Sequence, residues 1–200
     1  RAIEFAPKKG LRNPEIPLMI FRWNENIPQS SLNILEKQKG QTENLLQTHV
    51  RKGNLPIQNH LNVILKLLQI NWEIGNINDF EIHLNTFQKL LEKYPSDFHQ
   101  GWLHNVIGIK HFQSGERDRA ITSIKSAARQ DPGNLSFQIN SAITHHGVGK
   151  NRDANTILEK ILTQKNISEH LKIIGYIYLL MGKFDKSFNI LFNALKINPD

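Results

Sequence analysis

Small residues recur along the second half of the chain at a nearly constant spacing, and this recurrence limits the possible fold more than any other feature. Gly149 follows Gly115 by 34 residues, and Gly182 follows Gly149 by 33. Two further sets of small residues keep the same phase: Gly108, Ala142 and Gly175, then Ala120, Ala154 and Ser187. A fixed period of this length is typical of stacked helical hairpins that each pack only on their neighbours. The sequence therefore predicts an all-α chain, folded as a right-handed α-solenoid of stacked antiparallel helical hairpins.

The small residues have two physical roles in such a hairpin. A glycine near the turn supplies the left-handed backbone conformation that ends the first helix. At the crossing of the two helices, close approach requires residues without bulky side chains. A side chain at Gly108 or Gly175 is therefore expected to force the two helices apart.

The third unit carries the clearest motif, which runs Leu171-x2-Ile174-Gly175-x2-Tyr178, then Ser187-x3-Leu191, then Pro199. It resembles the tetratricopeptide repeat (TPR), whose pattern is W-x2-L-G-x2-Y, then A-x3-F, then P. The first unit keeps part of this pattern in Ile107-Gly108, Ala120-x3-Ile124 and Pro132, and the second unit diverges most. The resemblance covers about residues 97–200 and implies that the solenoid is TPR-like.

The prolines and the repeats suggest three regions. Residues 1–28 contain four of the eight prolines, which predicts an extended, proline-rich arm. Residues 29–95 are expected to form N-terminal helices, including one degenerate repeat-like hairpin at about 57–95. Residues 96–200 are expected to form three TPR-like repeats, at about 101–134, 135–167 and 168–200.

Helix signals in the N-terminal region predict three helices. The first begins near Leu32 and runs to about Val50, with Gly40 expected to bend or interrupt it. The second opens at Pro56 and ends at Ile74, before Gly75-Asn76. The third runs to about Lys93, with Asn78 or Asp79 expected as its N-cap.

The net charge of +7 is spread rather than concentrated. Residues 1–52 carry 9 basic and 5 acidic side chains, residues 53–100 carry 3 and 5, and residues 101–200 carry 13 and 8. A groove that follows a phosphate backbone needs an uninterrupted basic stripe with stacking aromatic rings. We therefore expect no nucleic-acid partner. The absence of an apolar run near 18 residues also predicts no membrane span.

No motif for catalysis or cofactor binding occurs in the chain. It lacks G-x-S-x-G, phosphate-loop, G-x-G-x-x-G and H-E-x-x-H sequences. The nine histidines are the alternative source of chemistry, but His104 and His111 are seven residues apart, whereas metal-binding histidines usually lie three or four apart. We interpret them as structural, and expect no catalytic residue, no metal site and no cofactor.

The resemblance implies that the first helix of each repeat lines a concave groove for a protein or peptide partner. Carried over residue by residue, the family's groove positions are Trp102, Asn105, Ile109, Phe112 and Gln113 in the first repeat, Ser136, Ile139, Ile143 and His146 in the second, and Glu169, Lys172, Tyr176 and Leu179 in the third. The alternative is that several of these residues pack against the next repeat and bind no ligand.

These observations favour a non-catalytic scaffold or adaptor that binds protein segments in its groove. The alternative is a TPR accessory domain of a larger enzyme, a glycosyl-, sulfo- or other transferase, with the catalytic part outside this chain. A cytoplasmic location is expected, with an exported or periplasmic one as the alternative, since the chain lacks cysteine and does not begin with methionine.

Two further expectations concern the ends of the chain. The last predicted helix carries apolar residues around much of its circumference, which predicts that more chain follows or that the third repeat self-associates. The arm contains apolar residues such as Phe21 and Trp23. It is expected either to cap the first helices or to fold back into the groove.

Overall fold

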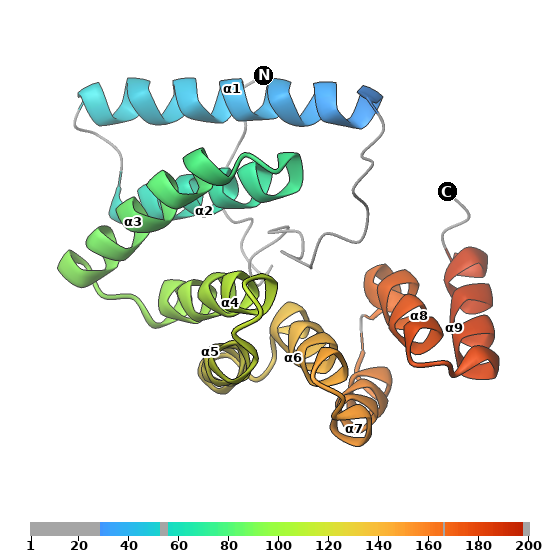
Figure 1. The fold of residues 1–200 in the computed structure, drawn as a ribbon. Helices are drawn as coiled ribbons and strands as arrows, with labels where there is room; N and C mark the ends of the chain where they lie inside the picture. Colours follow the sequence, from blue (N-terminus) through green and yellow to red (C-terminus); the bar gives the residue numbers. More distant parts are fainter. Residues whose placement is uncertain (1–28, 53–55, 166, 198–200) are drawn as a thin grey trace. The chain divides into compact units, whose positions relative to one another are not determined.

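The computed structural model describes residues 29–52, 56–165 and 167–197, and every regular element in this part of the chain is helical (Figure 1). The prediction of an all-α fold is thus confirmed. Nine α-helices and one short 3-10 helix follow one another in this part: α1 (Gln29–Lys52), α2 (Ile57–Ile74), α3 (Ile77–Lys93), α4 (Asp97–Gln113), α5 (Arg117–Gln130), α6 (Leu135–Gly147), α7 (Asn151–Leu162), η1 (Ser168–His170), α8 (Leu171–Leu180) and α9 (Phe184–Ile197).

The described residues fall into two compact units, one ending at Leu103 and the other beginning at His104. The first unit is built around α2, which packs against both α1 and α3. Between Leu61 and Trp72 only Asn62 and Lys66 are not buried, because apolar residues occur on nearly every face of this helix. Gly75 ends α2 in the left-handed conformation, with φ of 83°, as its sequence position predicts.

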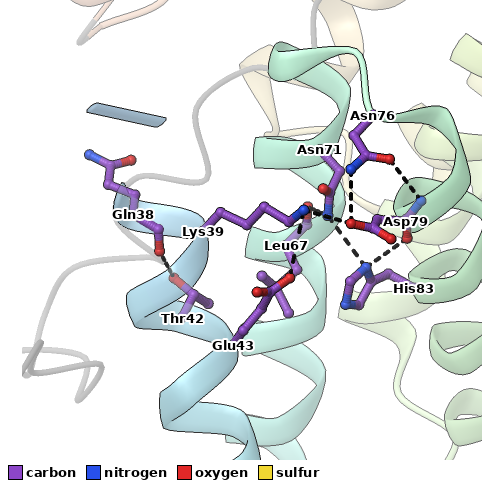
Figure 2. Close-up of polar contacts among 9 residues, drawn as sticks. All are labelled: Gln38, Lys39, Thr42, Glu43, Leu67, Asn71, Asn76, Asp79 and His83. Carbon is purple, nitrogen blue, oxygen red and sulfur yellow. Dashed lines mark hydrogen bonds and ion pairs between the residues drawn. The ribbon is translucent and has the colours of Figure 1, made fainter. Parts of the chain in front are cut away.

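A polar network joins α1 to α3 within the first unit (Figure 2). The Lys39 Nζ atom lies 2.6 Å from Asp79 Oδ2 and 3.8 Å from Glu43 Oε1. Asp79 Oδ2 also accepts a 2.9 Å hydrogen bond from Asn76 Nδ2. The Lys39 hydrogen bond lowers the pKa of Asp79, and the same bond raises the pKa of Lys39, so both groups stay charged.

The second unit repeats the helical hairpin. Helix α6 packs on α7 and α8 packs on α9, while α5 contacts α6. The glycines between the paired helices, Gly115, Gly149 and Gly182, have φ values of 78°, 79° and 71°. This left-handed conformation is the one predicted from their spacing, and it is accessible to glycine at little cost.

The helix crossings in the second unit are as tight as the sequence predicts. A Cβ atom placed on Gly108 would lie 2.6 Å from Ile124 Cγ1, and one placed on Gly175 would lie 2.7 Å from Leu191 Cγ. In the third hairpin the Ser187 hydroxyl donates to the Gly175 carbonyl at 2.8 Å. A small residue at each of these positions therefore sets the distance between the two helices of its hairpin.

Two details of the N-terminal helices differ from expectation. Helix α1 continues through Gly40 without interruption. A single glycine costs a helix only about 1 kcal/mol, which the rest of α1 offsets. The N-cap of α3 is Asn76 rather than Asn78 or Asp79, and its side chain accepts a 3.1 Å hydrogen bond from the Asp79 amide.

Some expectations lie outside the described residues. They are the extended arm at 1–28 with its two alternative positions, and the ends of the second and third repeats at Asn166 and Pro199. The division into an arm, N-terminal helices and three repeats stays a prediction.

Candidate functional site

In the second unit, the part of α4 that begins at His104 lies beside α6, and the two are the first helices of successive repeats. Asn140 Nδ2 of α6 donates to Asn105 Oδ1 of α4 at 2.8 Å, and both side chains are fully buried. Nearer the ends of the same helices, Phe112 packs so closely on Gly147 that a Cβ atom there would overlap its ring. Two helices that the resemblance assigns to the groove are therefore direct neighbours.

Six of the thirteen predicted groove positions are buried in the structure. They are Trp102, Asn105, Ile109, Ser136, Ile139 and Ile143, of which only Ser136 is as much as 9% exposed. Trp102 belongs to the first unit and the other five to the second. In this conformation these side chains contribute to the packing of the chain and offer little surface to a ligand.

The other seven predicted groove positions keep part of their surface. We call them the accessible first-helix residues: Phe112, Gln113, His146, Glu169, Lys172, Tyr176 and Leu179. They come from the last turns of α4 and α6, from η1 and from α8. This set combines two aromatic rings, an aliphatic side chain, an amide, an imidazole and one charge of each sign.

Neighbouring side chains hold part of this surface in place. The Arg117 guanidinium lies 4.3 Å from the centre of the Phe112 ring, within range of a cation–π interaction. His146 Nδ1 is 2.7 Å from Asn151 Oδ1, the first residue of α7. Phe112 thus contacts both Arg117 and Gly147, and these two contacts limit the orientations open to its ring.

Sequence reasoning missed that α6 is buried on nearly every side. Nine of its residues between Ser136 and His145 are buried, and only Gln138 in that stretch is not. The sequence does contain a sign of this burial, because no Lys, Arg, Asp or Glu occurs in this helix. Some polar groups inside it are bonded within the helix, as when Thr144 Oγ1 donates to the Asn140 carbonyl at 2.7 Å.

His99 is a structural histidine of the first unit. It is 3% exposed, its Nε2 atom donates to Asn62 Oδ1 at 2.8 Å, and its Nδ1 atom accepts from the Ser96 hydroxyl at 2.8 Å. Both bonds suit the neutral ring, since Oδ1 can only accept. Burial lowers the pKa of His99 to about 4, so the ring is neutral near pH 7.

Two histidines of the repeats are also engaged by their neighbours. His111 Nδ1 lies 3.0 Å from Glu116 Oε2. The hydrogen bond from Arg119 is the main reason that the pKa of Glu116 is lowered, and His111 adds to the effect. His145 Nδ1 donates to the Ser141 carbonyl at 2.7 Å.

Two other kinds of site do not occur within residues 29–52, 56–165 and 167–197. No three His, Cys, Asp or Glu side chains there gather in an arrangement that could hold a metal ion. No helix in the same ranges is both long enough and apolar enough to cross a membrane.

A polar junction links α7 to the hairpin that follows it. The Tyr178 hydroxyl of α8 donates to Glu159 Oε1 of α7 at 3.3 Å, and Lys186 of α9 pairs with the same carboxylate. Lys183 donates to Asn155 of α7. Burial raises the pKa of Tyr178, and the Lys186 hydrogen bond lowers the pKa of Glu159. The outer face of α7 is therefore a contact face between successive hairpins.

Comparison with known proteins finds matches among solved structures only. No protein-family model matches the chain, and no curated protein matches its sequence. Among solved structures, a thermophilic TPR protein of Thermus thermophilus matches with a TM-score of 0.55 and 16% identity, over 81% of this chain and 92% of that one. The crystal structure of MamA matches with a TM-score of 0.49 and 20% identity, over 80% of this chain and 91% of MamA.

The fold and the surface together define a class: this is a protein built from repeated helical hairpins that contact one another in series. Its particular architecture is a TPR-like α-solenoid, supported by the repeat motifs, the hairpin geometry and the match to the Thermus structure. The predicted resemblance and fold class are thus confirmed.

Proposed function

We propose that the chain is a non-catalytic scaffold that binds a segment of another protein across the accessible first-helix residues. One observation carries this proposal. The first helices are otherwise mostly buried, yet they keep Phe112 and Tyr176 partly exposed and Leu179 40% exposed. Apolar and aromatic side chains presented by a rigid helical framework are typical anchors for a protein partner.

The chemistry of this surface favours an uncharged, extended partner segment. Phe112, Tyr176 and Leu179 can cover apolar side chains, and the Gln113 amide can bond to a peptide group. Glu169 and Lys172 are only three residues apart and carry opposite charges, so this surface is not suited to a polyanion. This surface therefore favours a protein segment over a nucleic acid.

The surroundings of the two buried histidines argue against a catalytic role for these two rings. His99 and His145 are buried, and each bonds to groups of the protein itself. A general base has to reach the proton that it removes, and these rings do not face open surface. We propose that the chain contributes binding and geometry, and no reacting group.

Selection of peptides from a displayed random library against the 200-residue chain tests the binding proposal. Selected peptides are expected to bind the variant Tyr176→Ala/Leu179→Ala at least tenfold more weakly, because buried anchors dominate interface energies. Tyr176→Phe keeps the ring and is expected to bind nearly as well as the original chain. Lys125→Ala, an exposed change on α5, is the matched control and should leave affinity unchanged.

Two results would contradict the proposal. In the first, every selected peptide binds the double variant as tightly as the original chain. In the second, a photoreactive residue placed at Lys172 fails to crosslink bound peptides, while one placed at Lys125 succeeds.

A further inference from the structure

Helix α9 presents an unusually apolar outer face. Phe184, Phe188 and Phe192 are 67%, 68% and 48% exposed, and Leu195 continues the same row at 53%. Their spacing of four, four and three residues places them on one side of the helix. The rings of Phe188 and Phe192 already stack, with centres 5.9 Å apart and planes 8° apart. The four side chains form one continuous strip, which we call the α9 stripe.

The earlier repeats carry more polar residues at the positions of the α9 stripe. Aligned through Ala120, Ala154 and Ser187, these positions hold Arg117, Ile121, Lys125 and Ala128 in α5, and Asn151, Asn155, Glu159 and Leu162 in α7. In α7 this is the face on which Asn155 and Glu159 contact the next hairpin. The α9 stripe thus occupies the position that in α7 contacts the next hairpin, with aromatic side chains in place of polar ones.

The area of the stripe indicates how strong such a contact can be. If a fully exposed aromatic side chain offers about 200 Å², the stripe leaves on the order of 500 Å² of apolar surface. Isolated apolar residues on a protein surface need no explanation, but a contiguous patch of this size is as large as the largest patch on a typical monomer, and such patches are often functional. A stable interface takes about 800 Å² from each partner, so the stripe suits a weak and reversible complex.

The charges beside the stripe are arranged so that a second copy of α9 would complement them. Asp185 and Lys196 are eleven residues apart, which is three helical turns, so both lie along the same edge of α9 at its opposite ends. Lys196 follows this edge closely, with its Nζ atom 4.3 Å from the centre of the Phe192 ring. A second copy of α9 running antiparallel would bring each Asp185 beside Lys196 of the other copy. A parallel copy would instead oppose like charges at both ends.

We propose that the α9 stripe is a self-association face on which two copies of the chain pair antiparallel around a two-fold axis. Phe188 and Phe192 of both copies form the centre, and the two Asp185–Lys196 pairs close its ends. One self-complementary face used by both copies is the commonest way in which proteins form dimers. The antiparallel arrangement also places the positive end of each helix dipole beside the negative end of the other. This inference does not depend on the proposed peptide-binding function.

Analytical ultracentrifugation of the 200-residue chain over about 1–200 μM tests the pairing at the affinities expected of a small interface. A concentration-dependent monomer–dimer equilibrium is expected. Phe188→Glu should weaken it at least tenfold, because it puts a charge at the centre of the apolar contact. Phe188 is exposed, so circular dichroism should show an unchanged fold. Ile82→Glu, on an isolated exposed residue of α3, is the control and should leave the equilibrium unchanged.

Cysteine crosslinking tests the direction of the pair, because the chain contains no cysteine of its own. The double variant Asp185→Cys/Lys196→Cys is expected to oxidise to a covalent dimer. Asp185→Cys alone should not, since its two copies would lie about 16 Å apart along the helix axis. Exchanging the charges in Asp185→Lys/Lys196→Asp should restore association that either single change weakens.

Several outcomes would overturn the inference. A monomer at every concentration, or an unchanged equilibrium in Phe188→Glu, removes the stripe as the contact face. Efficient crosslinking of Asp185→Cys alone shows a parallel pair. Growth into larger oligomers shows a contact between two different faces. Peptide affinity measured on Phe188→Glu separates this result from the binding proposal, because the stripe lies outside the accessible first-helix residues.

Discussion

Gly175 lies where α8 crosses α9, and the space around it is too small for even one methyl group. A Cβ atom there would approach Leu191 Cγ to 2.7 Å and Leu191 Cδ2 to 2.8 Å. We expect Gly175→Ala to lower the free energy of unfolding by about 1 kcal/mol, since an overpacking cost of about 1–3 kcal/mol exceeds a gain of about 1 kcal/mol in helix propensity. Urea denaturation measures this difference.

The background Leu191→Ala provides the control for Gly175→Ala. With the leucine side chain shortened, the added methyl group fits and only the gain in helix propensity remains. Gly175→Ala should therefore raise stability in that background. An equal loss of stability in both backgrounds would show that the crossing of α8 and α9 is not the cause.

His99 is expected to make stability depend on pH. Its pKa is about 4 in the folded chain against 6.5 for a free histidine, so the unfolded chain binds more protons between these values. The contribution of the neutral His99 ring to the free energy of unfolding is therefore fully present above about pH 6.5, and it is lost as the pH drops toward 4. Allowing for solvent screening, the loss is on the order of 2 kcal/mol.

The measurement compares the original chain with His99→Gln, whose neutral side chain can still bond to Asn62 and Ser96. Unfolding free energies at pH 7.5, 6 and 5 should converge between the two proteins as the pH falls, because only the histidine carries the proton penalty. The explanation fails if the pH dependence survives unchanged in His99→Gln.

At the scale of elements, the Lys39–Asp79 pair joins two helices that are far apart in sequence. Its atoms are 2.6 Å apart, and the Lys39 side chain is only 14% exposed, which limits screening by solvent. A double-mutant cycle with Lys39→Ala and Asp79→Ala should give a coupling energy of about 0.5–1 kcal/mol. Pairing Lys89→Ala with Asp79→Ala is the control, and its coupling should be near zero.

The helix boundaries show how much of the fold could be predicted from the sequence. Pro56 and Gly75 bound α2 as predicted, because the two residues act on the backbone through their own geometry. The turn glycines of the repeats were predictable for the same reason. Gly40 was not, since whether a glycine breaks a helix depends on the stability of the residues around it.

The candidate site could be predicted as a set of positions but not as a surface. Periodicity assigns Asn105 and Ile139 to first helices, and it cannot tell whether a neighbouring helix then covers them. That depends on how closely α4 and α6 approach, which Phe112, Gly147 and the Asn105–Asn140 bond decide together. Only the lack of charged residues in α6 pointed to its burial beforehand.

At the scale of the whole molecule, the described helices of each unit contact helices that lie near them in the sequence. Each hairpin of the second unit meets the one before it or after it, and the first unit has a core of its own around α2. In such an array the free energy of folding is close to a sum over hairpins and their junctions. The Tyr178–Glu159 junction is such a contact made by polar groups, and the α9 stripe is proposed to make one with aromatic side chains.

The side-by-side arrangement of α4 and α6 also sets a length scale for any bound segment. Packed helices lie about 8–10 Å apart. A polyproline II chain completes a turn every three residues and advances about 9 Å in doing so. A segment in that conformation, lying across the two helices, would present the same side of itself to each in turn. The partner would then be recognised by apolar residues spaced at every third position of its own sequence.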